Sequence, residues 1–171
     1  MAGEKFLKNV SGAVTETAAV QSSAGAADAG KIIAADSTGH LDVTFLPTGV
    51  GPDVASITAS EVLAAGAWVN VYNLAGAARA RNADGSVAGK RPDGFVKSAV
   101  SNGATATVYF GGLNDAVTGQ TVGDVYLTTT PGVGGPVGSI PTAAGNVQMR
   151  IGVAISATAV SFKPTAPITL A

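Results

Sequence analysis

The alternation of apolar with polar or small side chains after residue 53 is the feature that most constrains what this chain can fold into. A period of two is that of a β-strand with one buried face. The pattern is clearest in residues 147–155 and in residues 104–110. We therefore expect the apolar face of each segment to point into the core: Val147, Met149, Ile151, Val153 and Ile155 in the first, and Ala106, Val108 and Phe110 in the second.

Shorter segments also have the composition of β-strands: residues 68–73, 94–100 and 125–129. Turn sequences rich in glycine, asparagine and aspartate separate the candidate strands. The Ser-Asn-Gly turn at residues 101–103 lies between two apolar runs and predicts a β-hairpin. Residues 60–65 could form either one helical turn or a loop. The pattern predicts a mostly β chain in which residues 51–171 form a small antiparallel β-barrel or β-sandwich.

The sequence before residue 51 has a different composition. Residues 9–30 consist mainly of alanine, glycine, serine, threonine and valine, without an aromatic residue. No stripe of large apolar residues at helical spacing is present, so an amphipathic helix is not expected. Such a segment is either disordered in a lone chain or ordered against other polypeptides. A Gly- and Pro-containing hinge at residues 49–52 then divides the chain into an extended inter-subunit arm, residues 1–50, and the β module, residues 51–171.

The composition favours association with other chains. Only 12% of the residues are charged and 5% are aromatic, while much of the 46% hydrophobic content is alanine. At about 25 cal/mol per Å² of buried apolar surface, a core of Ala and Val contributes less per residue than one of Leu and Phe. Burial against neighbouring copies would help to offset the conformational entropy lost on folding. The alternative is an ordinary small, alanine-rich bacterial domain.

Several classes of function are disfavoured. The chain contains no cysteine, which excludes disulfides and thiolate chemistry. Its ten basic residues are scattered and its net charge is −1, so we expect no nucleic-acid partner. The leading residues lack the apolar region of a secretory signal, and no apolar run approaches the ~18 residues of a membrane span. We expect synthesis in a bacterial cytoplasm and no membrane partner.

Catalytic signatures are weak. His40 is the only histidine and lies in a polar turn, where a solvated surface role is far commoner than catalysis. One histidine without cysteine cannot build a His- or Cys-based zinc cluster. Most aspartates, such as Asp28, Asp84 and Asp93, are explained as turn residues, and only the tertiary structure could bring two carboxylates together for acid–base chemistry. We therefore predict a protein that is not an enzyme and uses no cofactor.

Two sequences are near matches to ligand-binding loops. Residues 25–31 have the spacing of a phosphate-binding loop, but Ile32 replaces the Ser or Thr that would hold Mg²⁺, and Asp28 would repel phosphate. Residues 82–86 begin like a calcium loop but lack the later glutamate, so a plain turn is expected. A loose basic cluster surrounds that turn and reads as a solvated loop or a patch facing an acidic protein partner: Arg79, Arg81, Lys90 and Arg91.

Residues 29–47 resemble a stretch of the fibre and virion structural proteins of tailed bacteriophages. The shared pattern is A-G-K-I-x-x-x-[ND]-x-x-G-x-L-D-x-x-x-[LM]-P, which begins here at Ala29. The later module is similar to the small β-barrels of phage capsid decoration, or cement, proteins in three segments: residues 64–71, 94–96 and 103–110. Together the two similarities cover most of the chain. Typical cement proteins lack so long a fibre-like arm.

The resemblance implies a virion structural protein that is made in the host cytoplasm, most closely a capsid decoration protein binding the assembled shell. Such proteins are commonly homotrimers whose arms intertwine, so the implied partners are other copies of the chain and the major capsid protein or other virion proteins. A collar, tail-fibre or baseplate protein is the alternative. The residues assigned to subunit or shell interaction are small or apolar: Ala24, Gly25, Ile32, Ile33, Leu41, Phe45 and Leu46.

A further alternative is a carbohydrate-binding adhesin. Exposed and clustered aromatic side chains could stack on sugars, and the candidates are Trp68, Tyr72, Tyr109 and Tyr126. The competing interpretation places Trp68 in the core and the tyrosines at its rim.

Overall fold

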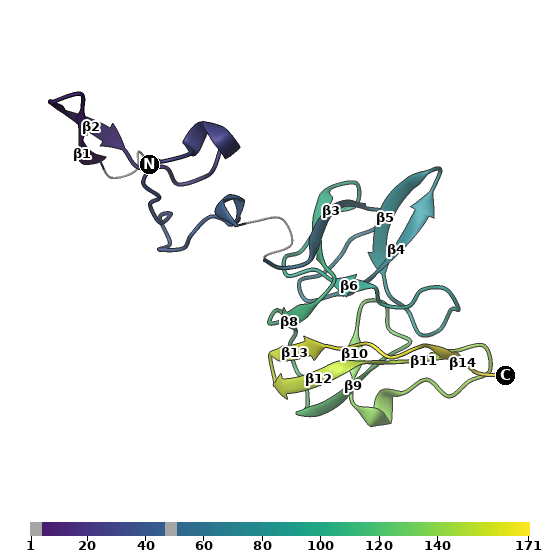
Figure 1. The fold of residues 1–171 in the computed structure, drawn as a ribbon. Helices are drawn as coiled ribbons and strands as arrows, with labels where there is room; N and C mark the ends of the chain where they lie inside the picture. The colour runs from purple at the N-terminus through teal and green to yellow at the C-terminus, as the bar shows by residue number, and fades with distance from the viewer. Residues whose placement is uncertain (1–4, 47–50) are drawn as a thin grey trace. The chain divides into compact units, whose positions relative to one another are not determined.

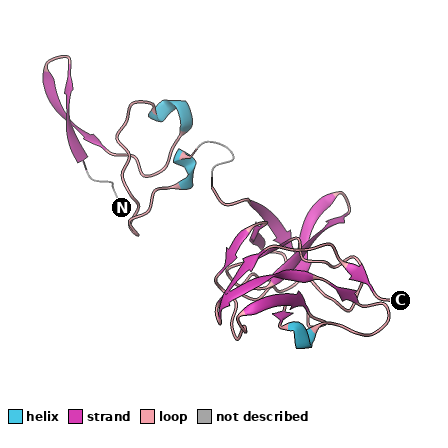
Figure 2. Ribbon diagram, turned by 60° about the horizontal axis from the view of Figure 1, so that its bottom comes forward, coloured by secondary structure: helices cyan, strands magenta, loops and turns pink. Residues whose placement is uncertain are grey.

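The structure is a computed structural model that describes residues 5–46 and 51–171 (Figure 1). The chain divides into two compact units, residues 1–51 and residues 52–171. Strands dominate, and the only helical elements in the described ranges are short 3₁₀ turns (Figure 2). The prediction of a mostly β chain is confirmed.

The first unit contains a β-hairpin followed by loops and two 3₁₀ helices: β1 (Lys5–Val10), β2 (Ala13–Ala18), η1 (Gly25–Asp28) and η2 (Val43–Phe45). β1 and β2 pair in antiparallel register along their full length. Further along, Val20 forms a parallel bridge with Ile33. The extended arm predicted from the sequence is not shown, because the chain reverses at Ser11-Gly12 and loops back between the bridged residues to run parallel to itself.

In the second unit five strands close a barrel in the order β3-β5-β4-β6-β7: β3 (Val54–Ala59), β4 (Trp68–Leu74), β5 (Ala77–Asn82), β6 (Gly94–Phe95) and β7 (Thr105–Tyr109). All pairs are antiparallel except β3 with β5. Ala106 and Val108 of β7 are buried in the barrel, and Phe110 packs against its core, as the alternation predicts. The other buried side chains of this core are Ile57, Ala59, Leu63, Ala67, Val69, Ala80 and Val96.

A five-stranded antiparallel sheet accompanies the barrel in the order β10-β9-β12-β13-β8. Its strands are β8 (Gly112–Asn114), β9 (Gly123–Leu127), β10 (Gly134–Gly135), β12 (Arg150–Ser156) and β13 (Ala159–Phe162). A separate two-stranded ladder and a 3₁₀ helix complete the unit: β11 (Val147–Gln148), β14 (Ile168–Thr169) and η3 (Val137–Ser139).

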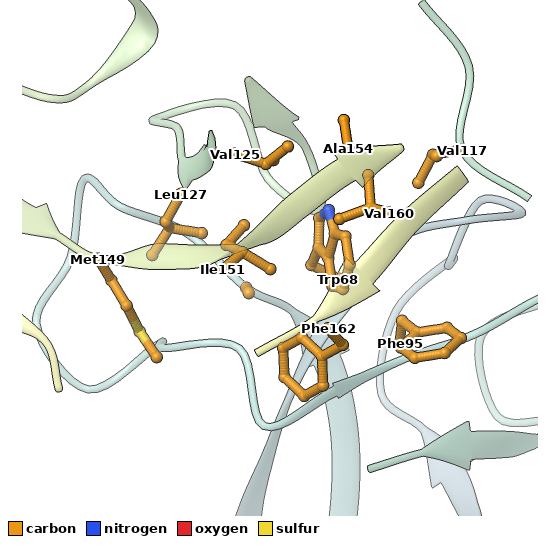
Figure 3. Close-up of a cluster of buried hydrophobic side chains, with 11 residues drawn as sticks. Trp68, Phe95, Val117, Val125, Leu127, Met149, Ile151, Ala154, Val160 and Phe162 are labelled. Carbon is orange, nitrogen blue, oxygen red and sulfur yellow. The ribbon is translucent and has the colours of Figure 1, made fainter. Parts of the chain in front are cut away.

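The barrel and the sheet share a core. Trp68 and Phe95 point out of the barrel, while the adjacent Val69 and Val96 point into it, so both faces of the chain are buried at these two places. Trp68 stacks on Phe162 of the sheet with ring centroids 5.4 Å apart (Figure 3). The remaining buried members of this cluster are Ala83, Val117, Val125, Leu127, Met149, Ile151, Ala154 and Val160.

β12 departs from the predicted alternation. Its pairing with β9 shifts between Arg150 and Gly152, which marks a β-bulge. Because a bulge adds one residue to one strand, the faces of the following residues are exchanged. Ala154 is therefore buried, Val153 is only half-buried and Ile155 is 59% exposed. The prediction that Val153 and Ile155 face the core with the preceding apolar residues is wrong.

The turn after Val100 forms without a hairpin. The Ala104 N–H donates to the Ser101 carbonyl at 3.1 Å, as expected of a turn. However, Val100 pairs with Leu63, and β7 pairs mainly with β3, so the two apolar runs do not form a ladder with each other. Residues 60–65 form a loop, in which Leu63 is fully buried.

Candidate functional site

Residues 5–46 contain no buried residue. Apart from the half-buried Val20, their large aliphatic side chains are exposed, from 37% at Leu46 to 75% at Leu7. We call this set the N-terminal apolar surface; its members are Leu7, Val10, Val14, Ile32, Ile33, Leu41, Val43 and Leu46. These exposed aliphatic side chains are candidate contacts for another polypeptide.

Hydrogen bonds hold this segment together in place of a core. The Val20 N–H donates to the Ile32 carbonyl at 3.0 Å, and the Ala34 N–H donates to the Val20 carbonyl at 2.9 Å. The Ser23 N–H donates to the Thr44 hydroxyl at 2.7 Å. Polar groups therefore lie between the loop segments, while the aliphatic side chains point outward.

The residues assigned from the sequence to subunit or shell interaction all lie in this segment. All are exposed except Phe45, which is half-buried in η2. Neither hydrophobic cluster of the described residues includes any of them: Ala24, Gly25, Ile32, Ile33, Leu41, Phe45 and Leu46. The fold thus leaves them available for contacts but does not join them into a core.

The turn around His40 is structural. Asp36 Oδ1 accepts the Thr38 hydroxyl at 2.6 Å, the Thr38 N–H at 2.8 Å and the His40 N–H at 3.0 Å. These donors, the Thr38 hydroxyl foremost, lower the pKa of Asp36 to about 2. His40 Nδ1 lies 3.1 Å from the Thr38 hydroxyl. Because that hydroxyl donates to Asp36, the side chains of Asp36, Thr38 and His40 together close a turn.

In residues 25–31, the near match to a phosphate-binding loop, the carboxylate of Asp28 accepts hydrogen bonds from the chain itself. Asp28 accepts the Ala24 N–H at 2.5 Å and the Lys31 ammonium at 2.7 Å. The Lys31 side chain, followed by the Ala24 N–H, lowers the pKa of Asp28. The amide and lysine that would bind a phosphate are thus already paired with an anion.

Residues 82–86, which begin like a calcium loop, form a turn that the side chain of Asp84 closes. Asp84 Oδ1 accepts both the N–H of Ser86 at 2.8 Å and its hydroxyl at 2.6 Å, and Lys90 Nζ lies 4.0 Å from Asp84 Oδ2. Within residues 5–46 and 51–171, no group of three or more His, Cys, Asp or Glu side chains is placed to hold a metal ion.

A buried asparagine organises the basic cluster. The Asn70 Nδ2 group donates to the Arg91 carbonyl and to Asp93 Oδ2, both at 2.9 Å, and Asn70 Oδ1 accepts Arg81 Nε–H at 2.9 Å. Arg91 Nε–H donates to Asp93 Oδ1 at 3.2 Å, and Arg81 lies 4.2 Å over the ring of Tyr72. The sequence analysis missed Asn70, although an asparagine flanked by β-branched residues in a buried strand signals a required polar contact.

An open groove of about 670 Å³ lies beside this network. Its lining mixes polar and apolar groups: Asn70, Val71, Gly89, Arg91, Asp93, Phe110, Val147, Pro167 and Thr169. Residues from distant parts of the sequence meet there, so the groove could not be located from the sequence.

The aromatic side chains do not gather into an open platform. Trp68 is 1% exposed, as the core interpretation predicts. Tyr109 stacks on Phe95 with ring centroids 5.4 Å apart, and Lys97 Nζ lies 5.3 Å from its ring centre. Protein groups therefore already cover these rings.

No family model, curated protein or solved structure matches this chain. The described residues include no helix with the length and apolarity needed to cross a bilayer.

Proposed function

We propose that the protein is a non-enzymatic structural protein that self-associates through residues 5–46 and acts within a larger assembly. The observation that carries this proposal is an ordered segment in which no side chain is buried. Its aliphatic side chains and its small residues are both available to a partner.

The free energy of such a segment favours contact with another chain. Fixing one residue's backbone costs about 1–2 kcal/mol of conformational entropy, and an isolated two-stranded hairpin is at best marginally stable in water. Fully burying one Val, Leu or Ile side chain contributes about 1.5–3 kcal/mol. The N-terminal apolar surface therefore stabilises the segment only when another polypeptide covers it.

Copies of the same chain are well suited as the covering partner. Lys5 already pairs with Glu16 at 2.5 Å and Lys31 with Asp28 at 2.7 Å. Covering these internally paired groups costs less desolvation than covering lone charges. Closed symmetric oligomers are the usual result of self-association, and a homotrimer is the form that the resemblance suggests.

We place this oligomer in the virion of a tailed bacteriophage, as a capsid decoration protein bound to the major capsid protein. Support comes from the virion-protein motif, three of whose fixed positions have a structural role here. Asp36 caps the turn, Gly39 has a φ of +82°, and Asp42 caps η2 by accepting the Thr44 N–H at 2.9 Å. A collar, tail-fibre or baseplate protein would differ in copy number: a shell coat needs hundreds of copies, whereas a tail or collar needs a few rings.

The proposal is tested by the mass of the full chain and of a fragment of residues 52–171 in solution. We expect an oligomer from the full chain. The fragment retains both hydrophobic clusters, so we expect it to be a folded monomer with an unchanged Trp68 fluorescence spectrum. A monomeric full chain, or a fragment that keeps the same oligomeric state, would refute the role of residues 5–46.

Point variants locate the interface more closely. Replacing Ile32 and Ile33 together by serine should raise the concentration for half-association by about tenfold or more, equivalent to 1.4 kcal/mol. Val122→Ser is the matched control, because Val122 is 70% exposed in the second unit and its loss should leave association unchanged. Equal effects of the two variants would contradict the proposal.

A further inference from the structure

One edge of β4 is only partly paired. In an antiparallel ladder, alternate residues direct both backbone groups to the same neighbour. The Trp68 carbonyl accepts the Ala83 N–H at 2.9 Å on the β5 side, so Val69, Val71 and Asn73 point to the opposite edge. On that edge β6 pairs only with Trp68 and Val69.

Beyond Val69 a side chain takes the place of a strand. Asp93 Oδ2 accepts the Val71 N–H at 2.9 Å. The Val71 carbonyl and both backbone groups of Asn73 have no partner within the described part of the chain. Figure 1 shows β4 and β5 extending past the short β6 at this point. Such unpaired groups are what an added strand pairs with.

The open groove borders this edge. Asn70 and Val71 of β4 contribute to its lining, and Phe110, Val147 and Pro167 supply apolar surface. An unpaired strand edge beside apolar lining is the arrangement that binds extended peptides, because the edge supplies main-chain hydrogen bonds and the lining accepts alternate side chains.

Two arginines and one carboxylate, that of Asp93, lie at the groove, so the net charge there is positive. Among the described residues, Arg81 hydrogen-bonds to neutral partners only, the Asn70 side chain and the Gly89 carbonyl. Arg91 is exposed and uses Nε to bind Asp93, and no partner of its terminal guanidinium nitrogens occurs in the described residues. Guanidinium groups with unused N–H donors favour carboxylates.

We propose that this groove binds an extended, acidic segment of another polypeptide. The segment would donate an N–H to the Val71 carbonyl, pair with both backbone groups of Asn73 and place a carboxylate against Arg91. This site lies in the second unit and does not depend on self-association through residues 5–46.

Dye-labelled synthetic peptides test the site on the full chain by fluorescence anisotropy. The acidic probe is Thr-Glu-Val-Glu-Val-Thr, and the basic probe replaces both glutamates by lysine. We expect the acidic peptide to bind about tenfold or more tightly than the basic one. An acidic peptide N-methylated at alternate residues keeps its charge but loses strand-pairing donors, and should lose binding by a similar factor.

Two positions in the protein supply matched variants. Asn73→Pro removes the free N–H and should weaken binding of the acidic peptide about tenfold, while Asn73→Ala keeps that N–H and should change it less than about twofold. Arg91→Gln should abolish the preference for the acidic probe. The fluorescence of Trp68 verifies that each variant is folded.

The proposal is overturned if the acidic peptide does not bind, if both probes bind equally, or if N-methylation has no effect. Tight binding of heparin with no binding of the acidic peptide would also overturn it. That result would assign the arginines to a polyanion other than a peptide. None of these outcomes alters the mass measurements that test self-association.

Discussion

Ser11 and Ala75 each hold a backbone conformation that L-residues rarely adopt. Both have a φ of 53°, and each is followed by a glycine at positive φ in a two-residue hairpin turn. A type I′ turn requires positive φ at both central positions and matches the twist of the strands. The usual signals for such a turn are Asn-Gly and Asp-Gly. Neither dipeptide occurs at these turns, so they were not predicted from the sequence.

Relief of this strain at Ala75 should stabilise the second unit. Ala75→Gly removes the clash of Cβ in the left-handed region but increases the freedom of the unfolded chain, so we expect a net gain of about 0.5–1 kcal/mol. The change in the free energy of unfolding is measured by urea denaturation, monitored through Trp68 fluorescence. The control Ala78→Gly, inside β5, should instead lose about 0.5–1 kcal/mol. A loss of stability in both variants would contradict this account.

The Asp36 turn should respond to acid. The donors of Thr38 and His40 hold the pKa of Asp36 at about 2, below its ordinary 3.8. A carboxyl with a lowered folded-state pKa stabilises the fold above the unfolded-state pKa, and this contribution disappears as the pH falls through the folded-state value. NMR titration of the Thr38 amide should therefore give a midpoint near pH 2 that is absent in Asp36→Asn. A midpoint close to 4 would show that the turn is not formed in solution.

At the scale of the element, β12 combines two side-chain patterns in one strand. Ile151 lies before the exchange of faces that the bulge causes and is fully buried. Ile155 lies after this exchange and is exposed. The sequence presents both as members of one apolar face. The bulge depends on pairing with β9, which lies more than twenty residues earlier in the chain.

This difference can be measured by truncation. Ile151→Ala should destabilise the fold by about 2–5 kcal/mol, because it opens a cavity in the core shared by barrel and sheet. Ile155→Ala should change stability by no more than about 0.5 kcal/mol. The denaturant midpoints of the two variants measure these losses of stability. Comparable losses in both variants would mean that the bulge is absent.

At the scale of the molecule, the two units differ in how they gain stability. Residues 52–171 have two hydrophobic clusters, one inside the barrel and one joining it to the sheet. The described residues of the first unit form no hydrophobic cluster. They are held by a hairpin, capped turns and ion pairs. The stability of the first unit should therefore depend on other molecules, while that of the second should not.

Hydrogen exchange at several protein concentrations should reveal this contrast. The inward-facing amides of β1 and β2 should become more protected as concentration rises, because association stabilises the folded hairpin by mass action. Amides of β4 and β12 should show no such dependence. Protection of the hairpin that is strong and independent of concentration would indicate a self-sufficient first unit.

The sequence by itself determined the mostly β character of the chain and the lack of a core-forming pattern before residue 51. These features follow from local periodicity and composition, because a period of two and the sizes of side chains act within a few residues. The same local rules explain the alternation of Ala106 and Val108 in β7.

Only the tertiary structure decided the parallel pairing of β3 with β5, the reversal of faces in β12 and the meeting of Asn70, Asp93 and two arginines beside an open strand edge. Each of these depends on contacts between residues far apart in the chain. Local sequence specifies that a strand forms and which side chains alternate, but the choice of neighbouring strand is made by long-range packing and hydrogen bonding.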